Sequence, residues 1–219
     1  MAVTLETSPD LGPRKDFLIS AGMLEGLNRI NQVGAERAQE ALARLLGQEV
    51  PVAIESITIL PLILLANRLR HADEEYLGCH VRIFGELQAE LYCYLRAGDA
   101  RLLVNAVLRR TLLRRVNRSV ELSALSEVTN ILANAYWHAL HGHVPLDWRI
   151  SPPALVARIE RVFALASRIG HYDHLVFQTD LLLGSFGAHL YFCLIPGADC
   201  LNRLLGYLEA DRLRPLVPT

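Results

Sequence analysis

Four polar side chains recur at helical spacing within an otherwise apolar stretch of this chain. They are Ser123, Glu127, Asn130 and Asn134. On a helix with about 100° per residue they fall within roughly 60° of one another, and leucine, valine and alanine gather on the opposite side. A carboxamide both donates and accepts hydrogen bonds, so it can hold a water molecule at a fixed angle. The pattern predicts a helix that buries one face and displays an acid and carboxamides on the other.

The composition is that of a globular protein. The 219 residues are 52% hydrophobic and carry a formal net charge of −1, enough for one large core or two small ones. The balanced charge gives no reason to expect nucleic acid as a partner. No apolar run reaches about 18 residues, so no membrane span is expected, and the N-terminus lacks the features of a signal peptide. We therefore expect a cytoplasmic protein.

The cysteines fit that expectation. No C-x-x-C pair occurs among them, which argues against a redox motif, and buried free thiols are predicted rather than a disulfide framework. The four are Cys79, Cys93, Cys193 and Cys200.

Two halves of the chain share a pattern. Residues 89–98 (AELYCYLRAG) align with residues 188–197 (AHLYFCLIPG) at an offset of 99, and the same offset relates Asn31 to Asn130 (31 + 99 = 130). One register spanning a helix and a hairpin is hard to obtain by chance. We predict two copies of one supersecondary unit.

Each copy is expected to contain a long helix, a strand, a short helix, a β-hairpin and a closing helix. The expected ranges are 24–46, 52–59, 61–70, 77–84 with 87–95, and 99–109, then 121–140, 147–150, 153–166, 172–182 with 186–195, and 199–209. This order predicts an α+β fold with long helices packed on one face of a largely antiparallel sheet. The copies span about 17–110 and 119–210, forming one domain over 17–210 after a disordered lead at 1–16.

The polar helix also resembles a known family. Ser123-x3-Glu127-x2-Asn130, followed after 22 residues by Pro153, is similar to the signature of the CheC/CheX/FliY family of CheY-phosphate phosphatases. The duplicated layout is similar to the family fold over roughly 17–210. The resemblance implies a CheC-like tandem fold and dephosphorylation of a phosphorylated, CheY-like response regulator.

The resemblance also implies roles for the residues. Asn130 would orient the water that attacks the aspartyl phosphate in line, and Glu127 would pair with the regulator's active-site lysine. Ser123 and Asn134 would contact the partner, although a packing role for Asn134 is at least as well supported. The Mg²⁺ of this reaction belongs to the regulator, so neither a metal nor another cofactor is expected in this chain.

The first copy departs from the pattern. Asn31 stands at the position of Asn130, but Asn28 stands at the position of Glu127 and Leu24 at that of Ser123. Asn28 and Asn31 are interpreted as remnants of a second site, which could still dock a partner weakly. The second copy is expected to carry the activity.

Other interpretations of these segments stay open. The polar stripe could be a solvated helix face, or the surface of a non-catalytic module that docks the regulator or a CheD-like protein. His138, His141 and His143 could bind a metal, but histidines near a helix C-terminus are also favoured by the helix dipole. The basic run over 109–118 is interpreted as a solvated linker that could steer an acidic partner. The oligomeric state and the pathway are left open.

Overall fold

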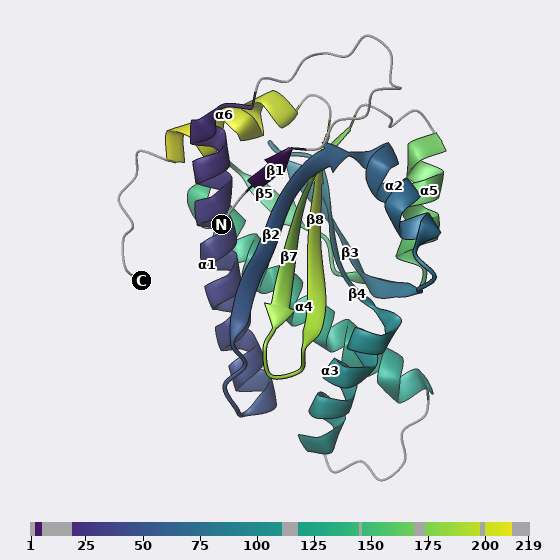
Figure 1. Ribbon diagram of the computed structural model, residues 1–219. Coiled ribbons are helices and arrows are strands. Elements are labelled where there is room, and N and C mark those ends of the chain that lie inside the picture. The colour runs from purple at the N-terminus through teal and green to yellow at the C-terminus, as the bar shows by residue number, and fades with distance from the viewer. Residues whose placement is uncertain are drawn as a thin grey trace.

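One sheet organises the molecule (Figure 1). The computed structural model describes residues 3–5, 19–110, 118–144, 146–168, 174–197 and 200–211. The strands are β1 (Val3–Leu5), β2 (Val52–Pro61), β3 (Tyr76–Gly85), β4 (Ala89–Arg96), β5 (Trp148–Ile150), β6 (Ala154–Val156), β7 (Leu175–Leu183) and β8 (Ala188–Pro196). Their order is β1-β2-β7-β8-β4-β3-β5, with β6 also paired to β3. Every pairing except that of β1 with β2 is antiparallel. The expected α+β class and largely antiparallel sheet are confirmed.

The two halves exchange their outer strands. β2 of the first half pairs with β7 of the second, and β5 and β6 of the second half pair with β3 of the first. At the centre β4 pairs with β8, and Cys93 lies opposite Phe192. These two residues are also related by the offset of 99 (93 + 99 = 192), so a pseudo-two-fold axis passes between them. Each half therefore needs the other to complete its part of the sheet.

Helices cover both faces of the sheet. The helices are α1 (Ala21–Leu46), α2 (Leu62–His71), α3 (Ala97–Arg110), α4 (Arg118–His143), α5 (Ile159–Arg168) and α6 (Leu201–Asp211). The two 26-residue helices α1 and α4 pack, with α3 and α6, over the larger core on one face. The prediction that long helices share one face is thus confirmed. The short helices α2 and α5 cover part of the opposite face over a second, smaller core.

Glycines allow α1 to approach its neighbours closely. A methyl group at Gly34 would lie 2.6 Å from the ring of Tyr136 on α4, and one at Gly26 would lie 1.9 Å from the carbonyl oxygen of Leu208 on α6. Both distances are too short for a side chain. The sequence thus fixes where α1 crosses its neighbours, and α1 in turn supports α4.

Two expectations for the elements are corrected. The helix expected over 153–166 begins at Ile159, and Ala154–Val156 form β6 against β3. The exposed edge of β3 offers unpaired backbone groups, which this segment satisfies. In the lead expected to be disordered, Val3–Leu5 form a strand beside β2, and the rest of residues 1–16 lies outside the described residues. Among the described helices none is long and apolar enough to cross a membrane.

Candidate functional site

The stripe on α4 faces outward, as its spacing predicts. Ser123 and Glu127 are exposed, and Asn130 and Asn134 are half-buried. The opposite side of the helix is buried in the larger core through Leu125, Val128, Leu132, Tyr136 and Leu140. The stripe is therefore accessible to a partner while the helix that carries it is held by packing.

Asn134 holds the carboxamide of Asn130 in one orientation. The Asn134 Nδ2 donates to the main-chain oxygen of Asn130 at 2.8 Å and to its Oδ1 at 2.7 Å. A main-chain carbonyl only accepts hydrogen bonds, so the Asn134 atom that contacts it must be the amino group. The Asn130 atom that contacts the same amino group must then be an oxygen. Both side-chain amides are thus assigned by the network itself.

This arrangement fixes what Asn130 can offer a ligand. Within the described part of the chain, its Nδ2 makes no hydrogen bond, and its Oδ1 keeps a second lone pair. Asn130 therefore presents one donor and one acceptor, side by side, in a fixed geometry. The amino group of Asn134, by contrast, is already hydrogen-bonded to Asn130.

Tyr136 anchors α4 to the sheet. Its ring stacks on Phe192 of β8, with the centroids 4.1 Å apart, and its hydroxyl donates to the Thr179 Oγ1 of β7 at 3.0 Å. Burial raises the pKa of the Tyr136 phenol, so it stays protonated and remains a donor. These contacts fix the rotation of α4 and hence the direction of its polar stripe.

Asn31 lies in the core, not on a second polar surface. It is only 1% exposed. Its Nδ2 donates to the Leu27 carbonyl at 2.9 Å, and its Oδ1 accepts a hydrogen bond from Thr179, the residue that Tyr136 also contacts. The suggestion that Asn31 could still dock a partner is therefore wrong for this packing. Asn28 is half-buried, and its enclosed Oδ1 has no hydrogen-bond partner among the described residues.

The burial of the two long helices shows that they are not related by the offset of 99 that aligns the rest of the two copies. Eight of the eleven buried residues of α1 have a buried counterpart 98 positions later on α4, and a ninth has one in Val144, directly after α4, whereas at an offset of 99 only four have a counterpart described as buried. One residue corresponds to about 100° of rotation on a helix, so the correct offset for the helices is 98. The hairpins keep the offset of 99, since β4 and β8 share their burial pattern at that spacing.

The new register changes the comparison of the two sites. Asn31 corresponds to Thr129 (31 + 98 = 129), and both side chains donate to the carbonyl four residues earlier in a buried position. The position of Asn130 is held in the first copy by the exposed Gln32, and that of Glu127 by Arg29. In the first copy a cation thus stands where the second copy has the acid Glu127, and the exposed acid Glu36 lies one turn after Gln32, at the position of Asn134.

The other sequence candidates lie apart from this stripe. Pro153 is half-buried between β5 and β6. His138 and His141 are exposed, and the rings of His141 and Trp137 lie 4.4 Å apart. Of the basic run, residues 111–117 lie outside the described residues. The four cysteines are buried and free, as predicted.

Another cluster escaped the sequence analysis. In the described ranges, Glu55, Asp180 and His189 form the only group of three or more potential metal ligands. They come from β2, β7 and β8, and no sequence spacing links them. The β7–β8 hairpin brings Asp180 and His189 together, and the strand exchange between the halves adds Glu55.

No protein-family model matches the chain, and no curated protein matches its sequence. Solved structures nevertheless share its fold. FliY of Thermotoga maritima matches with a TM-score of 0.66 and 13% identity, over 89% of this chain and 100% of that one. The FliM middle domain of H. pylori matches with a TM-score of 0.63 and 11% identity, over 86% of this chain and 99% of that one. Structures of H. pylori FliM in complexes with SpeE and with FliG also match.

A chemotaxis protein CheX from Desulfovibrio desulfuricans matches with a TM-score of 0.50 and 11% identity, over 77% of this chain and 99% of that one. Identities this low establish the fold alone. The resemblance to the CheC/CheX/FliY family is therefore confirmed as a shared fold that spans most of the chain.

Proposed function

We propose that this protein is a phosphatase of a phosphorylated, CheY-like receiver domain and acts through Glu127 and Asn130. The observation that carries the proposal is the carboxamide of Asn130, held by Asn134 on an outward face of α4, one turn from an exposed acid. The shared fold with a chemotaxis protein CheX supports the class of partner.

Asn130 would position the reactants. Hydrolysis of an aspartyl phosphate requires water to attack phosphorus in line, and catalysis of phosphoryl transfer rests largely on positioning and electrostatics. The free lone pair of Oδ1 can accept a hydrogen bond from the water, and Nδ2 can donate to a phosphoryl oxygen. Because Asn134 prevents the amide from turning over, both bonds form without reordering the side chain.

Glu127 would anchor the partner. A carboxylate next to a phosphoryl group repels it, so Glu127 is better suited to pair with a cation than to act on the phosphate. The active-site lysine of a receiver domain is such a cation, and a charge-assisted bond to it would seat α4 above the phosphoryl group. Ser123 lies one further turn along the same face, at the edge of this contact. The Mg²⁺ of the reaction would be supplied by the receiver domain.

The sequence leaves two roles open for Asn134, a partner contact and a structural role. Its amino group is bonded to Asn130, so we assign it as a positioning residue that acts through Asn130 and not as a partner contact.

The direct test is phosphate release from a phosphorylated CheY-like receiver domain with Mg²⁺ present. Adding the protein in substoichiometric amounts should accelerate the loss of phosphate over the spontaneous rate, with turnover. A protein that binds the phosphorylated receiver but leaves the spontaneous rate unchanged would refute the enzyme proposal.

A non-catalytic docking module is the second candidate. FliY and FliM match this chain with higher TM-scores than CheX does, and FliM of H. pylori forms complexes with SpeE and FliG. The same α4 face would then dock a response regulator or a CheD-like protein without hydrolysis. Stoichiometric binding without turnover in the assay above would favour this candidate.

A further inference from the structure

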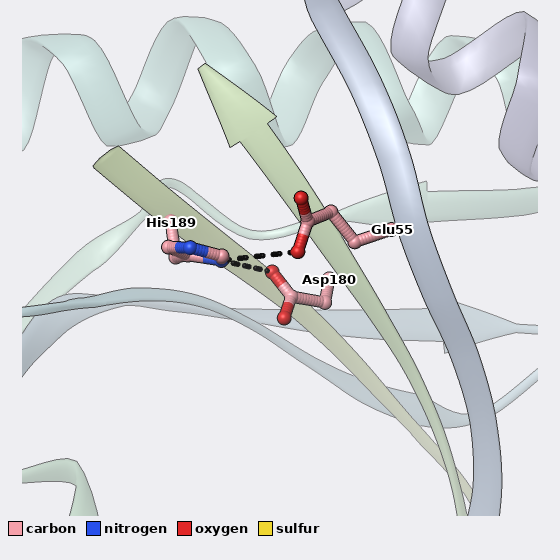
Figure 2. A group of neighbouring side chains, drawn as sticks. All are labelled: Glu55, Asp180 and His189. Atoms are coloured by element: carbon pink, nitrogen blue, oxygen red, sulfur yellow. Dashed lines mark hydrogen bonds and ion pairs between the residues drawn. The ribbon is translucent and has the colours of Figure 1, made fainter. Parts of the chain in front are cut away.

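Three side chains converge on the outer face of the sheet, opposite α4. Figure 2 shows His189, Asp180 and Glu55 directed toward one another. The His189 Nδ1 lies 3.0 Å from the Asp180 Oδ1 and 4.0 Å from the Glu55 Oε2, and the three potential ligand atoms all lie within 4.8 Å of one another. An imidazole and two carboxylates thus meet at one point.

A β-bulge brings Glu55 into this group. Ile54 pairs with Leu181 and Ser56 with Asp180, so Glu55 is the extra residue on β2. Bulges re-aim side chains and are over-represented next to functional sites. In β2 the bulge lets Ile54 and Ile57 both face the larger core, and it places Glu55 beside Asp180.

The two neighbouring carboxylates of this group favour the binding of a cation. Burial raises the pKa of Asp180, and the neighbouring Glu55 carboxylate raises it further, whereas the hydrogen bond with His189 and the charge of Arg96 lower it. Two carboxylates thus lie next to one imidazole at this point. A divalent cation would interact favourably with both.

The position is accessible to an ion. The side chains of Asp180, His189 and Glu55 are 18%, 29% and 43% exposed. The helices on this face, α2 and α5, lie toward the other end of β7 and β8 (Figure 1). An ion could therefore reach the three ligands without a change in the fold.

We propose that Glu55, Asp180 and His189 bind a divalent transition-metal ion of the zinc type. An imidazole with two carboxylates disfavours Ca²⁺ and Mg²⁺, which prefer all-oxygen sites. In a tetrahedral zinc site, with bonds of about 2.0–2.2 Å, neighbouring ligand atoms lie about 3.3 Å apart. The observed 3.0 Å is close to that value, so only Glu55, the most exposed of the three, has to move inward. The fourth position stays open to water.

Such an ion would link three strands. β2, β7 and β8 each contribute one ligand, so the ion would tie the strand of the first half to the hairpin of the second. The site lies on the face opposite the Glu127–Asn130 stripe and shares no residue with it. The two proposals can therefore fail independently.

Calorimetric titration of the full chain with Zn²⁺ tests the proposal. We expect saturable binding at one site, and an affinity at least about 10-fold weaker in Glu55→Gln and in His189→Ala, since even supporting residues of metal sites contribute 10- to 100-fold. Glu55→Gln exchanges an exposed side chain and keeps its shape, so it controls for misfolding of the other variant. His141→Ala, which removes an exposed histidine elsewhere, should bind Zn²⁺ like the wild type.

Co²⁺ provides a second measurement. The absorption spectrum of bound Co²⁺ distinguishes nitrogen and oxygen ligands from thiolates. We expect no thiolate charge-transfer band, and its absence would exclude the cysteines as ligands. The absence of saturable Zn²⁺ binding to the wild type would overturn the proposal. Unchanged affinity in both Glu55→Gln and His189→Ala would overturn it as well, and the cluster would then be a simple histidine–aspartate ion pair.

Discussion

The two long helices α1 and α4 agree on their buried faces and differ on their outward faces. At the offset of 98, buried residues match along both helices, and even the buried polar pair Asn31 and Thr129 makes the same bond to the carbonyl four residues earlier. The outward positions differ, with Arg29 and Gln32 on α1 but Glu127 and Asn130 on α4. Packing thus constrains one face of each helix, and the proposed chemistry belongs to the face that packing leaves unconstrained.

The difference in charge is the informative one. A carboxamide is present on both helices, but the acid of α4 corresponds to a cation on α1. If Glu127 anchors a lysine of the partner, Arg29 in the same place would repel that lysine. The first copy therefore supports the structure of the second without duplicating its proposed site.

The largest expected effect is on stability, where loss of the buried amide of Asn31 should cost more than loss of the exposed amide of Gln32. Asn31→Ala should lower the free energy of unfolding by about 2 kcal/mol, because it leaves Thr179 short of a buried partner and removes packed atoms. Gln32→Ala, one residue further along α1 and exposed, should change it by less than about 0.5 kcal/mol. Urea unfolding followed by circular dichroism measures both. Equal losses would show that the register of 98 is wrong.

The second-largest effect is expected from reversing the charge at Glu127, the proposed anchor of the partner. Glu127→Lys gives α4 the charge that α1 carries, so it should lower kcat/KM for the phosphorylated receiver domain by at least about 10-fold, about 1.4 kcal/mol. Most of this loss should appear as weaker binding, measurable by titration of the receiver domain. Arg29→Glu on α1 is the matched control and should leave binding almost unchanged. A variant Glu127→Lys with normal affinity would remove Glu127 from the interface.

A smaller effect is expected at the residue that holds Asn130. Asn134→Ala frees the carboxamide to turn over, so kcat should fall by about 3- to 10-fold with KM nearly unchanged, since positioning acts on the reaction step. A partner contact would instead raise KM. Asn134→Gln, which keeps an amide, is a further comparison. A rise in KM without a fall in kcat would return Asn134 to the partner interface.

The smallest effect would come from converting the first copy to the second. Arg29→Glu combined with Gln32→Asn gives α1 the same Glu–Asn pair that α4 carries at the corresponding positions. We expect phosphatase activity to rise by no more than about 2-fold, the limit for two equal sites. A clear increase in an Asn130→Ala background, measured by phosphate release, would show that the two residues suffice. A fall in activity would mean that α1 already contributes to the site in its present form.

Much of this arrangement could be predicted from local sequence patterns. The apolar periodicity of the long helices and the hairpins around Gly85 and Gly184 specify their own structure, so these elements lie within a few residues of their expected bounds. β6 could not be predicted in this way, because its strand structure depends on the open edge of β3.

The register of the helices depends on tertiary packing as well. The offset of 99, which fits the hairpins, aligns Asn31 with Asn130. The burial of the two long helices shows that they are related by an offset of 98 instead, so Asn31 corresponds to Thr129. The sequence also gives no sign of the Glu55–Asp180–His189 group, because Glu55 joins the hairpin residues Asp180 and His189 only where β2 of the first half pairs with β7 of the second.

The central claim is that the fixed carboxamide of Asn130 is the catalytic group. Single-turnover phosphate release from the phosphorylated receiver domain, with this protein in excess, tests it without interference from product release. Asn130→Ala should still bind the receiver domain but release phosphate at least about 10-fold more slowly than the wild type, whereas Gln32→Ala should match the wild type. Equal rates for Asn130→Ala and the wild type would contradict the account.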